Sequence, residues 1–249
     1  MSTADCISIF DWERHIDLSA WLDFVLECFQ KTPFQPDIVS FGADASHSRD
    51  SSLDELGNAV RGRQQDCRVI ELLATRPGYK QLAFGWRMCA GVNMTEFRTA
   101  ILCWETGRLD CSEVAKQMAT LFGPVYGIGF QRPFLKGPDL YAYGMSAGLG
   151  YTGADRIEAN RIRAWMRERM EQNRHKRGMF RDVYPLNLLT PAHITQEVER
   201  HSFAEWVRQS GERGELFDLG NQQWVWQVPD VAIQNVRGSL RSAGLIIAE

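Results

Sequence analysis

The sequence predicts an α+β fold in which antiparallel or mixed sheets carry packed helices. Three strand-like runs follow one another, separated by short turns, and then come a run with helical spacing and a fourth strand-like run. These segments are 67–74, 81–89, 95–104, 110–122 and 125–130. Three strands, a helix and a strand with short connections differ from the strict alternation of a doubly wound sheet, so the order of the elements favours α+β.

An amphipathic helix is expected before these strands, at 17–30. Its apolar residues recur at helical spacing, and Asp17 is placed to cap its first turn. Pro33 and Pro36 follow the expected end of this helix and disfavour its continuation. Residues 42–58 are rich in Ser and Asp, a composition that is typical of an exposed loop.

The C-terminal part predicts a second set of elements, which begins with a long helix at 154–173. Another helix is expected to start at Thr190-Pro191, because Thr can cap a helix and Pro suits its first turn. The remaining expected elements are helices at 203–208 and 229–240 and strands at 224–228 and 245–248. Trp224 and Trp226 are two residues apart in a strand, so both indoles should face the same side of the sheet.

A stretch rich in Gly, Pro and Tyr at 133–153 is the expected boundary within the chain. It divides the sequence into an N-terminal α+β half, 1–140, with an acidic first segment, and a C-terminal α+β half, 141–249. A chain of 249 residues can also form one continuous domain with a large core. Both arrangements are open at this point.

Charge is distributed unevenly along the chain. Residues 1–60 contain eleven acidic and three basic residues, which gives 11 − 3 = 8 negative charges. Because the whole chain carries −3, residues 61–249 carry +5. A chain with this balance has no overall basic field, so its composition argues against nucleic acid as a partner.

Cysteine and histidine usage indicates neither disulfides nor a metal. The six cysteines form no CxxC pair and several lie in apolar runs, which is typical of buried, reduced thiols. The five histidines show no HxxxH or HxE spacing, so we expect no metal and no other cofactor. The N-terminus lacks a signal-peptide pattern and no uncharged apolar run reaches about 18 residues. We therefore expect a cytoplasmic protein that has no membrane partner.

Two glycine motifs overlap at 144–153. Residues 144–148 read GMSAG and match GxSxG, which in hydrolases exposes a nucleophilic serine, here Ser146. Asp182 and then His193 or His201 follow in the order that such a hydrolase requires. Residues 148–153 match the GxGxxG of dinucleotide sites, but the acids about 20 residues further on fall within the same expected helix, which contradicts that geometry. A serine hydrolase that uses Ser146 is therefore the alternative function.

Residues 156–181 carry nine basic side chains. Acidic residues interrupt this run, and no aromatic residues alternate with it to stack on bases. We expect a solvated helix face with pairs such as Arg163 and Arg167 opposed by Glu171, or a face that docks on the acidic N-terminal part. We favour these two interpretations over nucleic acid; a nucleic-acid-associated protein that uses this helix is the third possible function.

The C-terminal half contains a longer pattern. RDVYPLNLLT at 181–190 leads to an expected helix with Trp206, then to GERGEL at 211–216, WVW at 224–226 and AGLII at 243–247. This pattern resembles bacterial immunity proteins of polymorphic-toxin and type VI secretion systems, and in particular the group paired with restriction-endonuclease-fold nuclease toxins. The resemblance covers about residues 65–249, and the acidic segment 1–60 lies outside it.

The resemblance implies a protein that is not an enzyme and neutralises a cognate secreted toxin by direct contact. It would either cover the active site of the toxin or hold the toxin in an inactive arrangement, and the oligomeric state is open. A nuclease has a basic substrate cleft, so an acidic surface would speed association with it. The residues expected to form this surface are Asp37, Asp44, Asp50, Asp54 and Glu55. Equally, these acids could serve only to solubilise an exposed loop.

Overall fold

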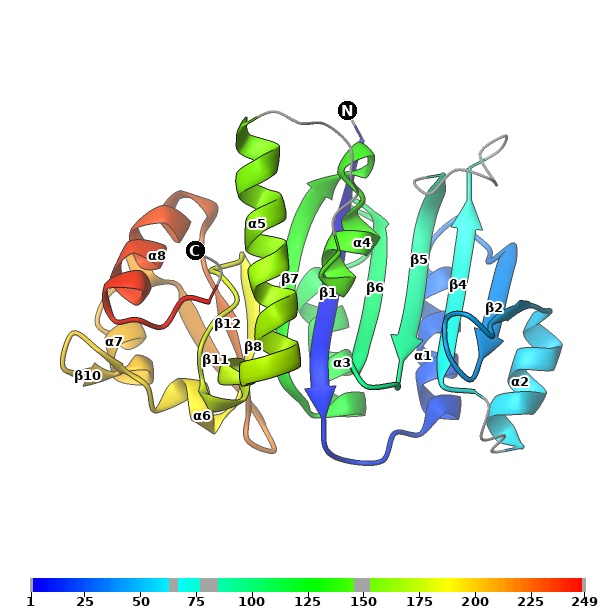
Figure 1. The fold of residues 1–249 in the computed structure, drawn as a ribbon, viewed down its shortest axis with the longest axis horizontal. Helices are drawn as coiled ribbons and strands as arrows, with labels where there is room; N and C mark the ends of the chain where they lie inside the picture. Colours follow the sequence, from blue (N-terminus) through cyan, green and yellow to red (C-terminus); the bar gives the residue numbers. More distant parts are fainter. Residues whose placement is uncertain (1, 63–66, 77–84, 146–152, 248–249) are drawn as a thin grey trace.

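A computed structural model describes residues 2–62, 67–76, 85–145 and 153–247 (Figure 1). Within these residues, ten strands form one sheet and two short strands form a separate pair. The strands of the large sheet are β1 (Thr3–Trp12), β2 (Ile38–Gly42), β3 (Arg49–Asp50), β4 (Val69–Thr75), β5 (Trp86–Asn93), β6 (Thr99–Glu105), β7 (Pro124–Pro133), β8 (Leu186–Leu189), β11 (Glu215–Gly220) and β12 (Gln223–Gln227). The separate pair is β9 (Glu197–Val198) and β10 (His201–Ser202).

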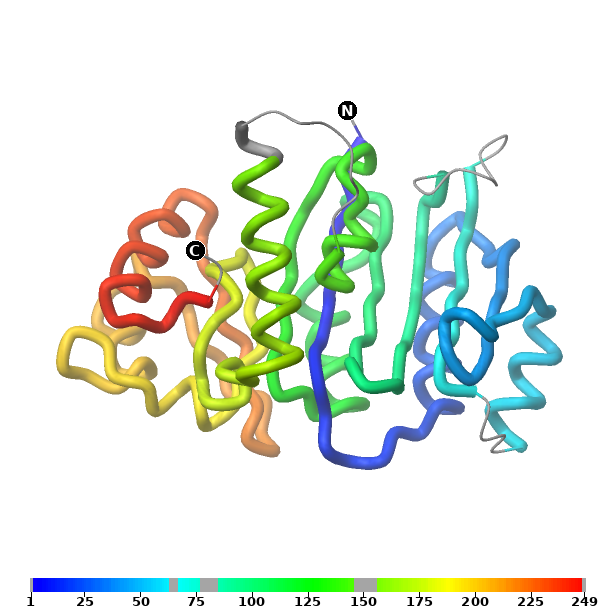
Figure 2. Tube along the Cα trace, in the orientation of Figure 1, coloured from blue at the N-terminus to red at the C-terminus, as the bar shows by residue number. Residues whose placement is uncertain are grey.

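The large sheet is antiparallel at every pairing between its described strands. Its strand order is β11-β12-β8-β7-β1-β6-β5-β4-β2-β3. Figure 2 shows that the chain begins in the middle of the sheet, builds the β2–β5 end, and later crosses to the β8–β12 end. The predicted α+β class is confirmed.

Helices cover both faces of the sheet and enclose two hydrophobic cores. The helices are α1 (Leu18–Gln30), α2 (Leu53–Arg61), α3 (Cys111–Phe122), α4 (Pro138–Tyr143), α5 (Gly153–Arg167), α6 (Pro191–Ile194), α7 (Phe203–Arg208) and α8 (Ile233–Ser242). Apolar side chains of α1, α2 and α3 pack into the core on one face, which we call the back face. Those of α4, α5, α7 and α8 pack on the other, the front face (Figure 1).

The N-terminal segment forms the central strand β1, which the sequence analysis did not predict. Its neighbours are β7 on one side and β6 on the other. Side chains on both faces of β1 are buried: Ile7 and Ile9 face the back core, whereas Cys6 and Phe10 face the front core. A strand that is buried on both faces lacks the alternation of apolar and polar residues by which a half-exposed strand is found.

The local predictions are confirmed for the first helix and for the strand expected at 67–74. The strands expected at 81–89 and 95–104 are shifted, since β5 extends to Asn93 and β6 begins at Thr99, and residues 81–84 lie outside the described residues. Asp17 caps α1, because its carboxylate accepts hydrogen bonds from the N–H groups of Ser19 (2.9 Å) and Ala20 (3.2 Å). The exposed loop expected at 42–58 is wrong in part, since α2 starts within it at Leu53. Ser52 and Glu55 form a reciprocal capping box there, and this motif stabilises a helix start despite the polar composition. The segment at the C-terminal end makes only a bridge between Ile246 and Phe180 instead of a full strand.

The two expected halves share the large sheet. The predicted boundary between residues 140 and 141 falls inside α4. Strand β8 from the C-terminal part pairs with β7 from the N-terminal part, with Leu188 opposite Gly127 and Leu186 opposite Gly129. A Cβ on either glycine would press against the facing leucine, so glycine permits this close contact between strands.

All six cysteines are free, and five of them are buried. Cys6, Cys89 and Cys103 lie side by side on adjacent strands of the front face. Burial raises the pKa of the Cys6 and Cys103 thiols, and the pKa of Cys89 is raised by its hydrogen bond with Cys103 and by burial. The prediction of buried, reduced thiols is confirmed. None of the described helices is long and apolar enough to span a bilayer.

Candidate functional site

The helical cover of the front face stops at β5. Figure 1 shows α4 and α5 in front of β1, β6 and β7, whereas no described helix lies in front of β2 and β4. Tyr143 of α4 marks the limit, because its hydroxyl occupies the space that a Cβ on Gly91 would need. Beyond Gly91 the front face of the sheet is therefore left without a described helix.

Strand pairing places acidic residues on this part of the front face, which carries no described helix but is approached at Gly42 by the backbone of His47 and Ser48. Asp50 lies opposite Ser40, Ser40 lies opposite Glu71, and Glu71 lies opposite Gly91. Directly opposed residues of an antiparallel pair project to the same side of the sheet. Since Tyr143 covers Gly91 from the front, Asp50 and Glu71 also belong to the front face.

Apolar residues of the same two strands lie beside these acids. Val69 and Leu73 lie two positions before and two positions after Glu71 in β4, so their side chains point to the same face as Glu71. Ile38 lies opposite Leu73 and therefore shares this front face. All three are only half-buried, in contrast to the fully buried residues of the same face under α4. We call this surface the open face: Ile38, Ser40, Asp50, Val69, Glu71 and Leu73.

The five acids predicted from the sequence lie at this end of the sheet, but two of them have clear local structural roles. The Asp44 carboxylate accepts hydrogen bonds from Ser46 and His47, which lower its pKa far below the ordinary value. Glu55 accepts hydrogen bonds from the Ser51 hydroxyl (2.5 Å) and the Ser52 N–H (3.1 Å), which lower its pKa in turn. Both carboxylates are therefore ionised at neutral pH.

The other three acids occupy different positions along this end. Asp37 precedes β2 and accepts hydrogen bonds from the N–H (2.8 Å) and hydroxyl (2.6 Å) of Thr75, which joins β2 to the end of β4. Asp50 lies on the edge strand β3, and Asp54 lies in the first turn of α2. Both are exposed, and neither forms an ion pair with a described residue. Asp50 is the one that the strand pairing places on the open face.

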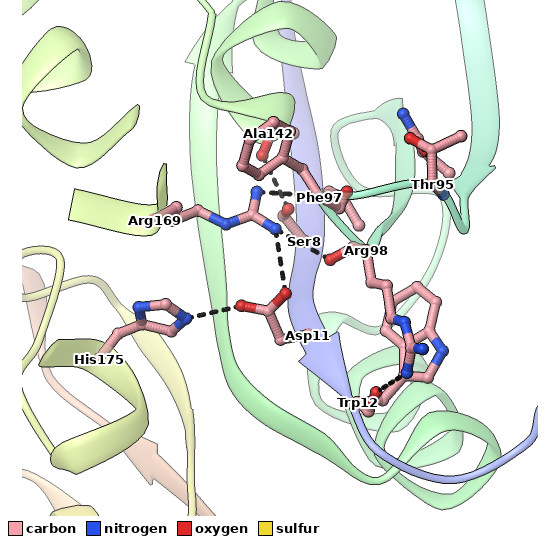
Figure 3. A network of polar contacts seen from close by, with 11 residues as sticks. Ser8, Asp11, Trp12, Thr95, Phe97, Arg98, Ala142, Arg169 and His175 are labelled. Atoms are coloured by element: carbon pink, nitrogen blue, oxygen red, sulfur yellow. Dashed lines mark hydrogen bonds and ion pairs between the residues drawn. The ribbon is translucent and has the colours of Figure 1, made fainter. Parts of the chain in front are cut away.

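A buried ionic network ties the end of β1 to the segment after α5 (Figure 3). The Asp11 carboxylate contacts His175 Nε2 at 2.7 Å and Arg169 Nη2 at 3.5 Å. Arg169 also donates to the Thr99 hydroxyl and to the Arg98 carbonyl, both at 3.0 Å. Burial alone would raise the pKa of Asp11, but the hydrogen bond with His175 and the charge of Arg169 lower it. The sequence analysis missed this network, because its members are far apart in the chain and form no local motif.

The network corrects part of the interpretation of the basic run at 156–181. Arg169 lies in a π-helical segment, Glu168–Gln172, and only 4% of its surface is exposed, so it is not part of a solvated face. Glu168 is also buried and binds Arg174 at 2.7 Å. Arg163 fits the solvated interpretation, since it is exposed and donates to Asn160 on its own helix. The alternative prediction, that this run docks on the acidic N-terminal part, is confirmed for Arg169, because Arg169 pairs with Asp11 of β1.

The hydrolase alternative depends on Ser146, which lies outside the described residues, as does most of the overlapping GxGxxG stretch. The Asp182 carboxylate is paired with Arg237 at 2.8 Å. His193 is fully buried and stacks on Tyr126, and burial lowers its pKa to about 3. His201 is exposed on β10.

A cavity of about 590 Å³ opens on the back face, at the start of α3. Its lining includes the carboxylates of Asp5, Glu215 and Asp230 and no lysine or arginine among the described residues. Asp5 is already engaged by the Gln131 amide (3.1 Å) and the Gly107 N–H (3.2 Å). Burial raises the pKa of the lining Cys111 thiol to about 12, so this thiol is protonated at neutral pH and is a poor nucleophile.

The described residues contain no group of three or more His, Cys, Asp or Glu side chains that could hold a metal ion. Among the features described above, the open face is the candidate for a functional surface, because it combines half-buried apolar side chains with an exposed carboxylate. Comparisons of the chain with models of known protein families, with curated proteins and with solved structures return no match.

Proposed function

We propose that this protein is an immunity protein that binds a cognate secreted toxin, a nuclease with a basic substrate cleft. It neutralises the toxin by direct contact and without catalysis. The observation that carries the proposal is the open face, where half-buried apolar side chains adjoin the exposed Asp50 carboxylate at an edge of the sheet. The second carboxylate of this face, Glu71, is half-buried, and burial raises its pKa. The resemblance of about residues 65–249 to immunity proteins is consistent with this assignment.

The open face has the two components that protein interfaces combine. Ile38, Val69 and Leu73 supply an apolar centre on neighbouring strands, and burial of such a centre provides affinity. Asp50 supplies charge at its rim, and Asp54, four residues further along the chain in the first turn of α2, adds an exposed charge at the same end of the sheet. Rim charges mainly accelerate the encounter with a partner of opposite charge and select against partners of the same charge.

The proposed compartment is the cytoplasm. The free state of all six cysteines supports a reducing environment, because oxidising compartments favour disulfides. In the cytoplasm, the protein would be present where a nuclease finds its substrate.

The test starts from the native host with a tagged copy of the chain. We compare the wild type, an Asp50→Lys/Asp54→Lys variant and a matched Glu215→Lys/Asp218→Lys variant, which reverses two exposed acids at the opposite edge of the sheet. We expect the wild type and the matched variant to retain a stoichiometric secreted protein with a nuclease-like domain. The purified partner should associate with the Asp50→Lys/Asp54→Lys variant about tenfold more slowly at low salt, because charge reversal removes electrostatic steering.

A growth assay then tests neutralisation. Expression of the captured protein should stop growth of a host that lacks this chain, and co-expression of the wild type should restore growth. Equal association rates for all three forms would place the interface elsewhere. Capture of no stoichiometric partner, or no protection in the growth assay, would contradict the immunity function.

Serine hydrolysis at Ser146 is the competing function, and one substitution separates the two. The Ser146→Ala variant should protect the host as well as the wild type does, because binding does not require a nucleophile. If the wild type hydrolyses ester substrates and Ser146→Ala does not, the protein is an enzyme and the proposal fails.

A further inference from the structure

A small cavity of about 240 Å³ lies between α5 and the segment that follows Phe180. It is far smaller than a protein interface, but at about 30 Å³ per water molecule it has room for about eight waters. Two arginines, Arg161 and Arg181, and two tyrosines, Tyr141 and Tyr184, contribute to its lining. Its position is separate from the open face.

Arg181 is buried in the wall of this cavity with 1% of its surface exposed. Both of its Nη atoms donate to the Tyr141 carbonyl, each at 3.3 Å, and its guanidinium lies 4.4 Å from the centre of the Tyr141 ring. A guanidinium has five N–H donors, so these two bonds leave donors unused. No carboxylate of a described residue lies within ion-pair distance of this charge. A buried charge without a counter-ion is costly.

Arg161 reaches the same cavity from α5. Its Nε atom is buried and has no hydrogen-bond partner. Its guanidinium also forms no ion pair with a described residue. The cavity therefore has two arginine side chains that form no ion pair with a described residue, although the charge of the nearby Asp182 acts on both.

The acids in the lining are each bound to an arginine that lies outside it. Glu158 is held by both terminal nitrogens of Arg132, at 2.5 and 2.9 Å. Asp182 is paired with Arg237 at 2.8 Å. The lining arginines and acids balance, and Arg132 and Arg237 add two further positive charges next to the cavity, which gives a local net charge of about +2. The Asp182 carboxylate also attracts Arg161 and Arg181, but neither lies within ion-pair distance of it.

The two tyrosines add a hydrogen-bond donor. Their hydroxyl oxygens are 2.9 Å apart, so one hydroxyl donates to the other. The second hydroxyl keeps its own proton available for another acceptor. Guanidinium and hydroxyl donors that converge on one small space are the groups that bind oxyanions.

We propose that this cavity is a binding site for a small oxyanion, a phosphate or carboxylate group held between Arg161 and Arg181. The anion would place a negative charge beside the buried Arg181 and accept a hydrogen bond from the tyrosine hydroxyl whose proton is free. This inference does not depend on the proposed immunity function, because neither the open face nor a toxin enters the argument.

The test measures binding of inorganic phosphate and of malonate by calorimetry, together with the shift of the melting temperature, against chloride at equal ionic strength. Phosphate or malonate should bind and raise the melting temperature more than chloride does. Tighter binding of phosphate would identify phosphoryl groups as the ligand class, and tighter binding of malonate would identify carboxylates. The Arg161→Gln variant should fold, since Arg161 makes no hydrogen bond or ion pair with a described residue, and should bind at least tenfold more weakly.

Two further variants keep the test specific. Tyr184→Phe keeps the ring but removes a hydroxyl, and it should weaken binding several-fold. Arg163→Gln removes an exposed charge from the same helix and should bind like the wild type. Equal effects of chloride, phosphate and malonate, or wild-type binding by Arg161→Gln, would overturn the proposal.

Discussion

Replacement of Asp11 by Asn should destabilise the protein by about 3 kcal/mol, because it removes the carboxylate that neutralises the buried Arg169 (Figure 3). Asn has nearly the same shape and can still accept a hydrogen bond from His175. Asp11 has a positive φ of 52°, and Asn tolerates this left-handed conformation as well as Asp does. The substitution therefore tests the charge and leaves the backbone unstrained.

The magnitude follows from the geometry of the pair. Two unit charges 3.5 Å apart, the distance between Asp11 Oδ1 and Arg169 Nη2, attract by about 5 kcal/mol at an effective dielectric constant of about 20. Part of this attraction offsets the cost of burying the carboxylate, which the Asn variant no longer bears. Arg169 also keeps its hydrogen bonds to Thr99 and to the Arg98 carbonyl. A net loss of about 3 kcal/mol lowers the melting temperature of a chain of this length by roughly 6–12 °C.

Thermal and urea unfolding at several pH values measure this loss. The pKa of Asp11 in the folded protein is lowered, so the stabilisation by its charge is complete well above the unfolded value of about 3.9. It is lost as the pH falls from there towards the folded pKa. The difference between wild type and Asp11→Asn should therefore be constant from about pH 5 to 7 and should shrink below about pH 4. The exposed control Asp50→Asn should change stability by less than about 0.5 kcal/mol. An Asp11→Asn variant as stable as this control would refute the reasoning.

Three further outcomes are expected. Gly91→Ala should destabilise the protein by about 1–3 kcal/mol, because the new Cβ overlaps the Tyr143 hydroxyl; added Tyr143→Phe should recover part of this loss in urea unfolding, and no recovery would contradict the contact. In thiol labelling at pH 8, the native protein should react fastest at Cys111, which is the least buried cysteine, whereas all six thiols should react in the unfolded protein. Rapid labelling of several thiols in the native protein would contradict the burial of the front core. Burial lowers the pKa of His193 to about 3, so its NMR signals should not titrate between pH 5 and 8. Because the unfolded chain binds a proton at this residue near pH 6.5 and the folded protein does not, His193 should also reduce stability as the pH falls below about 6.5.

The candidate surface was predictable only in part. The excess of acids in residues 1–60 pointed to this end of the molecule, and Asp50 and Asp54 are indeed exposed there. The position of Asp50 beside apolar side chains was not predictable from the sequence. It depends on two strand pairings, in which Asp50 lies opposite Ser40 and Ser40 lies opposite Glu71. A shift of one residue in either pairing would turn these side chains to the opposite face.

The sequence by itself determined the elements whose signals are local. The capping carboxylate of Asp17, the helical spacing that follows it and the shared face of Trp224 and Trp226 all depend on residues a few positions apart. Short-range hydrogen bonds and side-chain periodicity fix such features, so a window of sequence contains the information. The α+β class followed from the order of these elements.

Only the tertiary structure decided which distant segments meet. Asp11 and His175 are 164 positions apart, and β1 becomes the central strand because later segments, β6 and β7, pair with both of its edges. The charges of Arg161 and Arg181 acquire a shared cavity in the same way, through packing of α5 on the segment after Phe180. Each of these arrangements depends on strand register and helix packing across the whole chain, and the burial that shifts a pKa or leaves a charge unpaired exists only once that packing is complete.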